Sequence, residues 1–534
     1  MRAPAGFRGT FRSDDTARAL YSEGAGPFRL IPAAVALPAD VDDLGLLVAW
    51  ATATATPLTP RGAGSGMPGG NLGSGVVVDM GAFDRPLRVT LARTATAGAA
   101  VTWQALHEAA AHFGFRLPPD PSSGGFCTLG GMVATNAAGA RSLRYGSIRP
   151  WVRGLELLTT DGEAFWMHRA ATPPAHPLPS RLLGARPRAC ERLDAAGIRP
   201  AGNGFPTTTK NSAGYALDAW AASGDAVDLL IGSEGTLAFI TRVELTLGRI
   251  PDAAATVVLG LGTLDDLGEV VIRLLRLAPA AIELLDRSFL DMAETDLPLD
   301  GVAAILLVEF EGSAEAVEHA SAAVLADVPA VLARRGLDAE ARSRLWAIRH
   351  AASPALARLP DSQRSLQIIE DGCVPVARLA DYVRGVHAAA RAAAVPIVAF
   401  GHAGDGHLHV NALADLDRPD MADRLDRLRA EVTDLVIRLG GTPSGEHGDG
   451  RLRADALERL YDSGTVATFR RIKDAFDPAG ILNPGVILPV GGRPGYKGGP
   501  TAPAIPAAVA SALRARERDA DWATRPFGLL EEAP

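Results

Sequence analysis

Three glycine-rich segments within the first 250 residues constrain this chain more than any other feature of its sequence. The first covers residues 61–71, the second covers 118–146 and the third covers 232–236. Glycine-rich backbone leaves N–H groups free to surround an anion. One such loop alone is as consistent with a flexible turn as with a phosphate cradle. Three of them in one region favour a domain that binds a large cofactor carrying phosphate groups.

The loop at residues 61–71 does not match the common nucleotide-binding loops. Its glycine spacing differs from the dinucleotide fingerprint, and an apolar strand at 76–80 follows where that fingerprint requires a helix. No Gly-Lys-Ser or Gly-Lys-Thr closes the loop, which excludes a Walker-type nucleotide site. The sequence therefore predicts a phosphate cradle of another type.

Length and charge indicate a multidomain globular protein with no nucleic-acid partner. The chain has 534 residues, more than one ordinary core holds, so two or three domains are expected. Its composition is 47% apolar and 21% charged, as in globular proteins. The 53 basic and 61 acidic residues give a net charge of -8, which leaves no basic footprint for nucleic acid.

The cysteines and the apolar runs bear on the cellular compartment. Cys127, Cys190 and Cys373 are far apart and form no CxxC motif, so neither a disulfide framework nor an iron–sulfur cluster is expected. The sequence shows no apolar leader and no apolar run of roughly 18 residues. We therefore expect a cytoplasmic protein, with peripheral attachment to the inner membrane as the alternative.

Residue periodicity predicts several helices and strands. Residues 40–56 have the spacing of a helix, 239–247 alternate like a strand with one wet face, and 303–310 form a buried strand. Apolar residues between 425 and 439 recur at helical spacing and are followed by Gly440 and Gly441, which predicts an amphipathic helix.

Composition divides the chain near residue 250 and again near residue 490. Glycine loops dominate before the first boundary, and helix and strand patterns dominate after it. Residues 491–534 are rich in proline, glycine and alanine, which predicts an appended tail with one short helix at about 507–518.

Two short glycine-framed stretches carry the side chains most suited to chemistry. His402, His407 and His409 lie in the first stretch, and Glu446 and His447 lie in the second. His407, His409 and Asn411 alternate, so on a strand they share one face. A lone histidine is usually an ordinary polar residue, but five clustered ligand-type side chains indicate a metal site. Two imidazoles and one carboxylate suit Zn²⁺, with Mn²⁺ or Fe²⁺ as alternatives, and leave an imidazole for proton transfer.

The ordered set of segments resembles the vanillyl-alcohol oxidase, or PCMH-type, flavoprotein superfamily. Within it the chain is most similar to the FAD-linked D-2-hydroxyacid dehydrogenases, a branch that includes D-lactate dehydrogenases and the flavin subunit of glycolate oxidase. The resemblance runs in order from about residue 30 to 488 and ends with Phe-Asp-Pro-Ala-Gly-Ile-Leu-Asn-Pro-Gly at 476–485.

The resemblance implies an α+β fold in three parts. A PCMH-type FAD-binding domain of two α+β subdomains would cover residues 1–249. A cap domain with the substrate and metal site, built on an antiparallel sheet covered by helices, would cover 250–490. The tail would cover 491–534.

The resemblance also implies which positions hold FAD. Because residues 61–71 contain no histidine to which a flavin could be attached, we expect the FAD to be non-covalent. The expected cofactor-binding residues are Arg61, Gly62, Gly64, Ser65, Gly66, Gly69, Gly70, Asn71, Pro119, Asp120, Ser122, Ser123, Gly130, Gly131, Thr135, Asn136, Gly232, Glu234, Gly235, Thr236 and Asn483.

In the second half of the chain the resemblance assigns catalytic roles. His402, His409 and Glu446 would be the metal ligands. His447 would be the catalytic base, Asn411 would contact the substrate, and Arg349 would clamp its carboxylate.

Three further positions either differ from the family's usual residue or have a role that the sequence does not assign. His407 stands where the family usually has asparagine, and is either an extra ligand or a partner of a ligand. Ile369 stands where dicarboxylate-specific relatives carry a lysine, which favours a lactate-like substrate. Lys210, in a segment similar to one at the flavin edge, is equally consistent with a surface turn.

The function implied is FAD-dependent, metal-assisted oxidation of a D-2-hydroxy acid to the 2-oxo acid. Hydride would pass to flavin N5, and electrons would leave to a separate acceptor: a quinone, a cytochrome or oxygen. The alternatives are an FAD-containing oxidase, a non-redox flavoenzyme of the same fold, and a non-catalytic flavin subunit of a larger complex. A homodimer is consistent with the sequence.

Overall fold

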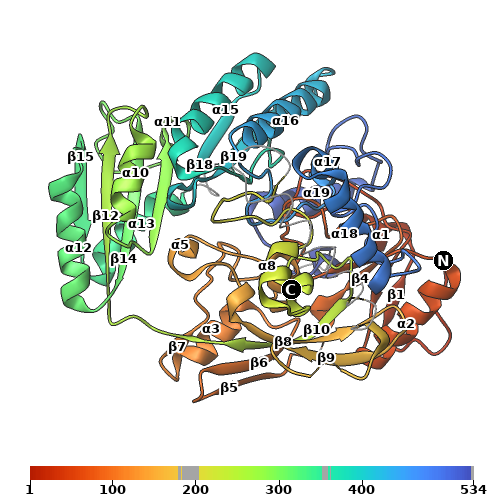
Figure 1. Cartoon of the computed structure of the whole chain (residues 1–534). Helices are drawn as coiled ribbons and strands as arrows, with labels where there is room; N and C mark the ends of the chain where they lie inside the picture. The colour runs from red at the N-terminus through yellow and green to blue at the C-terminus, as the bar shows by residue number, and fades with distance from the viewer. Residues whose placement is uncertain are drawn as a thin grey trace.

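Three β-sheets organise the computed structural model of the chain, two in the first half and one in the second (Figure 1). The structure describes residues 1–83, 85–172, 174–178, 182, 204–351, 356, 359–360 and 362–530. Cys190 lies outside these residues, and Cys127 and Cys373 are buried free thiols. No helix in the described ranges combines the length and apolarity needed to cross a bilayer.

The first sheet carries the first glycine loop between two of its strands. Val76 and Val78 face helix α2 (Val41–Thr54), whereas Val77 faces the opposite side, as the two-residue period of a strand requires. Strand β4 pairs in parallel with β2 and β3, and β1 pairs antiparallel with β2. In order across the sheet the strands are β1 (Thr10–Arg12), β2 (Ala34–Leu37), β4 (Val76–Asp79) and β3 (Leu58–Arg61).

The second sheet is antiparallel throughout and completes the first half of the chain. Its strands, in order, are β5 (Leu87–Thr90), β6 (Thr94–Gly98), β10 (Phe239–Thr246), β8 (Val152–Leu158) and β9 (Ala164–His168). The helices whose apolar residues share its core are α3 (Trp103–Ala111), α4 (Leu129–Thr135), α8 (Leu217–Ser223), α9 (Val227–Leu230), α17 (Leu457–Leu460) and α18 (Ser463–Phe476). Two short strands, β7 (Phe115–Arg116) and β11 (Gly248–Arg249), pair beside it.

The third sheet, the cap sheet, is antiparallel and belongs to the second half of the chain. Its strands, in order, are β15 (Leu332–Gly336), β12 (Ala253–Leu261), β14 (Ala304–Gly312), β13 (Ala281–Asp286), β18 (Ile397–His402), β19 (His407–Asp415) and β16 (Gln363–Leu366), with β17 (Gly372–Cys373) paired to β19.

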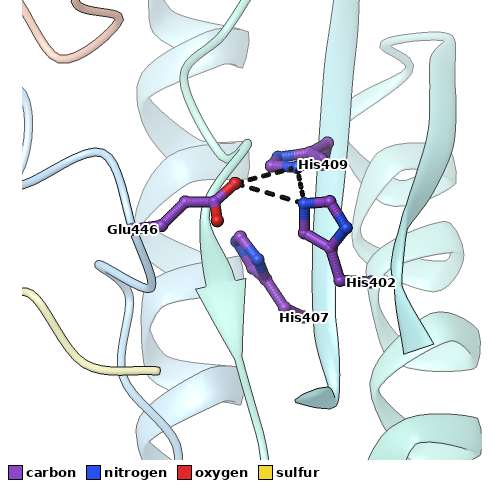
Figure 2. A group of neighbouring side chains, drawn as sticks. All are labelled: His402, His407, His409 and Glu446. Atoms are coloured by element: carbon purple, nitrogen blue, oxygen red, sulfur yellow. Dashed lines mark hydrogen bonds and ion pairs between the residues drawn. The ribbon is translucent and has the colours of Figure 1, made fainter. Parts of the chain in front are cut away.

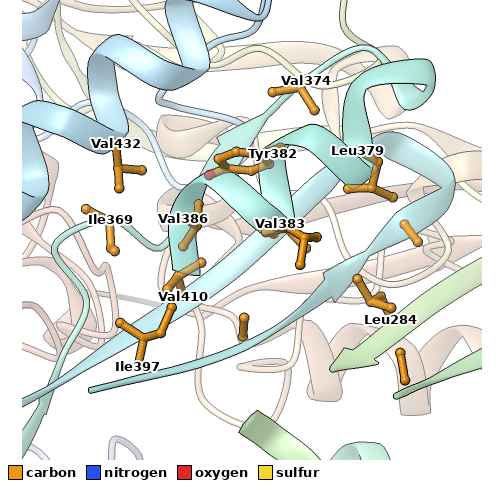
Figure 3. Packing of buried hydrophobic residues seen from close by; sticks show 14 of the residues in the cluster. Leu284, Ile369, Val374, Leu379, Tyr382, Val383, Val386, Ile397, Val410 and Val432 are labelled. Atoms are coloured by element: carbon orange, nitrogen blue, oxygen red, sulfur yellow. The ribbon is translucent and has the colours of Figure 1, made fainter. Parts of the chain in front are cut away.

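Helices cover one face of the cap sheet and leave the other face toward the first half of the chain. Ile397 and Val410 point into the layer formed with Val383, Val386 and Val432 (Figure 3). The helices of this layer are α10 (Leu267–Leu275), α12 (Ala314–Asp327), α15 (Leu379–Ala393) and α16 (Met421–Arg438). The opposite face meets α11 (Arg287–Leu290) and α13 (Ala339–His350).

Hydrogen bonds and ion pairs to two buried carboxylates join the cap sheet to the first half of the chain. Arg116 donates two hydrogen bonds to the carboxylate of Glu311, at 3.0 and 2.6 Å, and the Tyr145 hydroxyl donates to the same carboxylate at 2.6 Å. Arg141 donates from Nε to Glu309 at 2.6 Å. These contacts fix how the cap sheet sits over the glycine loops.

The C-terminal tail packs against the first sheet. Helix α19 (Ala507–Arg518) coincides with the predicted helix and buries Val509 and Leu513 in a cluster with Tyr21, Val35 and Val77. The tail therefore forms a layer on the face of the sheet opposite α2, which its low-complexity composition gave no reason to expect. Helix α1 (Asp15–Leu20) lies in the same layer.

The predicted α+β fold, with an antiparallel cap sheet covered by helices, is confirmed. The structure contains α2 where a helix was predicted at 40–56, β10 at 239–247, β14 at 303–310 and α16 around 425–439. Periodicity was reliable for α2, β10 and α16 because each has one buried face and one wetter face, whereas β14 was recognisable as a short, continuous apolar run buried on both faces.

Candidate active site

A cavity of about 530 Å³ lies between the glycine loops and the face of the cap sheet that carries α11 and α13. Gly62 and Gly130 line one end of it, and His402, His409 and Glu446 line the other. The two groups of residues that the sequence singled out therefore share one space, although 272 positions separate Gly130 from His402. The lining combines bare backbone, apolar side chains and a few converging polar groups, as cofactor sites do.

Most of the residues expected to bind FAD line this cavity. They come from all three glycine segments, which the folding of the first two sheets brings together. The lining residues among them are Arg61, Gly62, Gly64, Ser65, Gly66, Gly70, Asn71, Asp120, Ser122, Ser123, Gly130, Gly131, Thr135, Glu234 and Gly235.

The other six expected FAD residues do not line the cavity. Asn483 supports it from behind, because its side-chain amide donates to the carbonyls of Gly70 and Glu234. Asn136 and Gly232 line a separate small cavity of about 20 Å³. The remaining three are packed in the loops themselves: Gly69 against Phe28, Pro119 as the acceptor of the Trp103 indole N–H, and Thr236 bonded to Tyr215 and Ser233.

Arg61 and Gly64 show how tightly the first loop is built. The Arg61 guanidinium is buried and donates to the carbonyls of Tyr21 and Glu23. Gly64 has a φ of +81°, and a Cβ at this position would lie 2.6 Å from Arg61 Nη2. Only glycine keeps this loop open beside a fixed guanidinium. A backbone cradle with a buried cation fits the pyrophosphate of FAD.

At the cap end, three nitrogen and oxygen atoms converge (Figure 2). His402 Nε2 lies 3.2 Å from His409 Nε2 and 3.2 Å from Glu446 Oε1. His409 Nε2 lies 3.4 Å from the same oxygen. Ligand atoms around a tetrahedral zinc ion lie roughly 3.4 Å apart, given its bond lengths. The spacing of the three predicted ligands therefore fits a single divalent ion.

The outer hydrogen bonds of the two imidazoles decide which atoms face inward. His402 Nδ1 donates to Glu283 at 2.5 Å, and His409 Nδ1 donates to the backbone carbonyl of Glu370 at 3.0 Å. Both Nε2 atoms then direct lone pairs at the Glu446 carboxylate, and only a cation can hold three such atoms together. Burial opposes a charged ring, but Glu283 outweighs it and raises the pKa of His402 to about 9, so a proton competes with a metal there.

Lys210 and His407 complete the wall behind the ligands. Lys210 is buried, and its Nζ donates to Glu446 Oε2 at 2.6 Å, which leaves Oε1 as the oxygen facing the imidazoles. His407 Nε2 donates to Asp371 at 3.0 Å, and its Nδ1 lies 3.5 Å from Lys210 Nζ. His407 has its ligand atoms close enough to the group to share an ion with it. Lys210 therefore belongs to the site and not to a surface turn.

Glu283 forms hydrogen bonds with both His402, a predicted metal ligand, and Arg349, the residue expected to bind the substrate carboxylate. Its carboxylate is fully buried, accepting from His402 on one oxygen and from Arg349 Nε at 2.8 Å on the other. The Arg349 guanidinium also lies over the Phe400 ring, 4.6 Å from its centroid. Burial is outweighed by these two cations, which lower the pKa of Glu283 to about 2. One carboxylate thus orients a ligand and a substrate-binding group together.

His447 faces the same region with the partner that a general base requires. Its Nδ1 donates to Glu370 at 2.5 Å, and its Nε2 lies 3.6 Å from Glu446 Oε1. Burial disfavours the charged ring, but Glu370 and Asp371 outweigh it and raise the pKa of His447 to about 10. The two carboxylates therefore favour the protonated ring in the metal-free site, whereas a divalent ion at the neighbouring ligands would lower this pKa and leave Nε2 free to accept a proton.

Glu234 links the flavin loops to the loop that carries His447. Its carboxylate accepts the backbone N–H of Asp449 at 2.7 Å and that of Gly450 at 2.9 Å. Burial and the nearby Asp449 raise the pKa of Glu234 to about 8. The position of the loop at residues 444–450 is therefore fixed against a residue of the third glycine segment.

Ile369 does not bear on the substrate through a direct contact. Ile369 is buried in the core next to Val386 and Val432 and does not line the cavity (Figure 3). The chain bends at residues 368–369 after strand β16, so strand alternation no longer applies there. Gln367 and Glu370 are the residues of this segment that line the cavity.

Three further residues of the site were missed from the sequence, Glu283, Glu370 and Asp371, and the role of Lys210 was left open. Glu283 is an acid with apolar residues on both sides in the strand AIELLD, and such an acid needs a buried partner, which was a usable signal. Glu370 and Asp371 are adjacent acids that gave no indication of a partner. Arg141 also lines the cavity, and it donates to Glu309.

Family models and known proteins match most of this chain. The FAD binding domain model matches residues 32–168, and the model of the C-terminal domain of FAD linked oxidases matches residues 250–487. Glycolate oxidase subunit GlcD of Bacillus subtilis is 30% identical over 488 residues, which cover 89% of this chain and 93% of that protein. The chain belongs to the FAD-linked oxidase family.

Other relatives agree with this assignment. The D-lactate dehydrogenase of Archaeoglobus fulgidus is 29% identical over 490 residues, covering 90% of this chain and 95% of that protein. The 4-ethylphenol oxidase of Gulosibacter chungangensis has a TM-score of 0.65 at 16% identity, covering 90% of this chain and 94% of that one, and shares the fold.

The predicted membership in the FAD-linked, PCMH-type hydroxyacid dehydrogenases is confirmed. FAD is therefore the cofactor of this FAD-linked oxidase family member, and the protein is an FAD-linked oxidoreductase. The predicted action on CH–OH groups agrees with the names of its relatives.

We expect Gly64→Ala to weaken FAD binding by at least about tenfold, because the new methyl group would displace the Arg61 guanidinium. Titration of apoprotein with FAD, followed by flavin fluorescence, measures this change. Gly114→Ala is the matched control: its φ is +73°, but a Cβ there meets nothing within 4 Å. The control should lose about 1–2 kcal/mol of folding stability and keep its FAD affinity. Equal FAD affinities in the two variants would contradict this account of the loop.

Proposed function

We propose that this protein oxidises a lactate-like D-2-hydroxy acid to the 2-oxo acid with the help of a divalent metal, and passes the electrons through FAD to a separate acceptor. The observation that carries the proposal is the convergence of His402, His409 and Glu446 in the cavity that the glycine loops also line. Substrates named for the relatives, lactate and glycolate, belong to the same chemical class.

The residues of the cavity have distinct tasks in this reaction. Bound FAD supplies a two-electron acceptor, and a divalent ion at the three ligands supplies positive charge for the substrate oxygens. Arg349 binds the substrate carboxylate. Asn411, whose Oδ1 accepts from Ser365 at 3.1 Å, presents its amide N–H to the substrate. His447 Nε2 accepts the hydroxyl proton, and Glu370 stabilises the resulting imidazolium.

A substrate with one carboxylate fits the charges of the cavity. Among the described residues that line the cavity, the arginines besides Arg349 are Arg61 and Arg141. Arg61 lies in the first glycine loop, and Arg141 is paired with Asp120 and Glu309. His350 also lines the cavity, but burial and the neighbouring arginines lower its pKa. A second carboxylate would therefore lack a cation of its own, which supports a lactate-like acid on grounds independent of Ile369.

The donor set favours zinc, with manganese or iron as the alternatives. Three protein ligands leave a coordination position for substrate, as in catalytic zinc sites. The FAD is proposed to be non-covalent, because no histidine lies in residues 61–71. A non-catalytic flavin subunit would not require the intact His402, His409 and Glu446 group, so we rank that reading last.

Anaerobic mixing of the metal-replete protein with D- and L-2-hydroxy acids tests the proposal. The flavin absorbance near 450 nm, roughly where oxidised flavins absorb, should bleach with D-lactate-like acids and not with their L-forms. Chelation of the metal should slow the bleaching, and metal analysis of the same sample would identify the ion. If no acid bleached the flavin of the metal-replete protein, the proposal would be contradicted and a different flavin chemistry would be favoured.

We expect His447→Ala to keep its FAD but to reduce it at least about 100-fold more slowly, because general-base catalysis is lost. Stopped-flow measurement of flavin reduction by saturating substrate reports this rate. His387→Ala is the matched control, since His387 also pairs with a carboxylate, that of Asp286 at 2.6 Å, but lies on α15 away from the cavity. A wild-type rate in His447→Ala would refute the base assignment.

We expect Glu283→Gln to bind its metal about tenfold more weakly, because an amide offers His402 and Arg349 one acceptor where the carboxylate offers two. Competition with a chromophoric chelator measures the affinity. Glu309→Gln, a buried acid on the neighbouring strand β14 that does not touch His402, should keep the wild-type affinity. If both variants or neither lost metal affinity, Glu283 would have no special role in the site.

A further inference from the structure

The C-terminal residues 495–530, here called the C-terminal brace, lie beyond both regions that match the family models. Their helix α19 covers the face of the first sheet that α2 leaves open, with Val509 and Leu513 packed on Val35 and Val77. Figure 1 shows α19 beside α1 on this side of the molecule. The first glycine loop leaves this sheet at the end of β3 and returns to it at β4, so the brace packs directly behind the loop.

Arg516 of the brace contacts the glycine loop itself. Its side chain is 3% exposed, and its Nη2 donates to the carbonyl of Ala63, which lines the cavity, at 3.4 Å. The same guanidinium is held by the carbonyls of Thr524 and Asp521 at 2.9 Å each and lies 4.6 Å from the centroid of the Trp522 ring. The brace thus folds around Arg516 and presents it to the loop.

A second set of contacts reaches the loop through residues 21–28. Lys497, fully buried, donates its backbone N–H to Pro27 at 2.8 Å and its Nζ to Ala25 at 3.4 Å. Ala25 in turn donates its backbone N–H to Gly64 of the loop at 3.0 Å. Tyr496 stacks on Phe28, with ring centroids 5.7 Å apart. The brace therefore contacts the loop directly through Arg516 and indirectly through residues 21–28.

The brace also adds positive charge behind the loop. Arg516 and Arg61 are both buried there, and Nη1 of Arg516 has no hydrogen-bond partner in the described part of the chain. Burial and the repulsion from Arg61 lower the pKa of Arg516 to about 10. An anion bound on the other side of the loop would stabilise two buried guanidiniums in this position.

We propose that the C-terminal brace, acting through Arg516, fixes the first glycine loop in its FAD-binding shape and thereby sets how tightly the protein retains FAD. Arg516 is a positioning residue, since it contacts the loop and does not line the cavity. The inference rests on FAD binding alone, independently of the substrate and the metal.

The test compares two arginines of the same helix in the full-length protein. Arg516→Leu removes the contact to Ala63, whereas Arg514→Leu removes a contact at 3.2 Å to the carbonyl of Gln363 on the cap strand β16. Each apoprotein is titrated with FAD by flavin fluorescence, and its thermal unfolding is followed by circular dichroism. Arg516→Leu should weaken FAD binding about tenfold, the size of one hydrogen bond from a charged donor, and Arg514→Leu less than about twofold.

Three results are decisive. Loss of FAD affinity in Arg516→Leu alone, with partial recovery in Arg516→Lys, supports the brace. Wild-type affinity in Arg516→Leu overturns it. Equal losses in Arg516→Leu and Arg514→Leu, accompanied by equal drops in the unfolding temperature of the apoproteins, also overturn it, because α19 would then serve only general stability. Flavin reduction by substrate does not enter the readout, so the outcome does not depend on the proposed reaction.

Discussion

The two-residue period of the cap sheet is the constraint on which the chemistry of this protein depends. On β13, β18 and β19, one set of alternate residues fills the core beneath α15 and α16. The other set contains Glu283, His402, His409 and Asn411, all on the face that meets the flavin loops. A slip of one residue in any of these strands would exchange the two sets and place charged groups in the core. The apolar layer therefore fixes the positions of the polar site.

Buried charge around the cavity is balanced by pairing. Lys210 pairs with Glu446, and Arg453 pairs with Glu370 and Asp371, while Glu283 is shared between a histidine and an arginine. Pairs of this kind contribute little net stability, but removal of one partner leaves an unpaired buried charge that costs about 3–5 kcal/mol. They act mainly to specify one arrangement of the loops at residues 401–411 and 444–450.

The parts of this structure that were predictable from sequence are those recorded in local spacing. The glycine segments, the alternation of His407, His409 and Asn411, and the helix at α2 all follow from residues close together in the chain. Glu283 and Lys210 were not predictable as site residues, because their roles depend on strand register and on contacts across 119 and 236 positions. The core position of Ile369 was not foreseen, because an alignment with relatives does not report which way a side chain faces. The packing of residues 491–534 was not foreseen, because composition does not report contact with a distant sheet.

The hydrogen bonds from the loop of His447 to Glu234 bear on how molecules enter and leave. Together with the paired charges of Arg116, Arg141, Glu309 and Glu311, they tie the two halves of the chain on both sides of the cavity. A clamshell movement of the halves would have to break all of them at once in a low-dielectric interior. Such a movement would therefore cost far more free energy than a rearrangement confined to one loop beside the cavity.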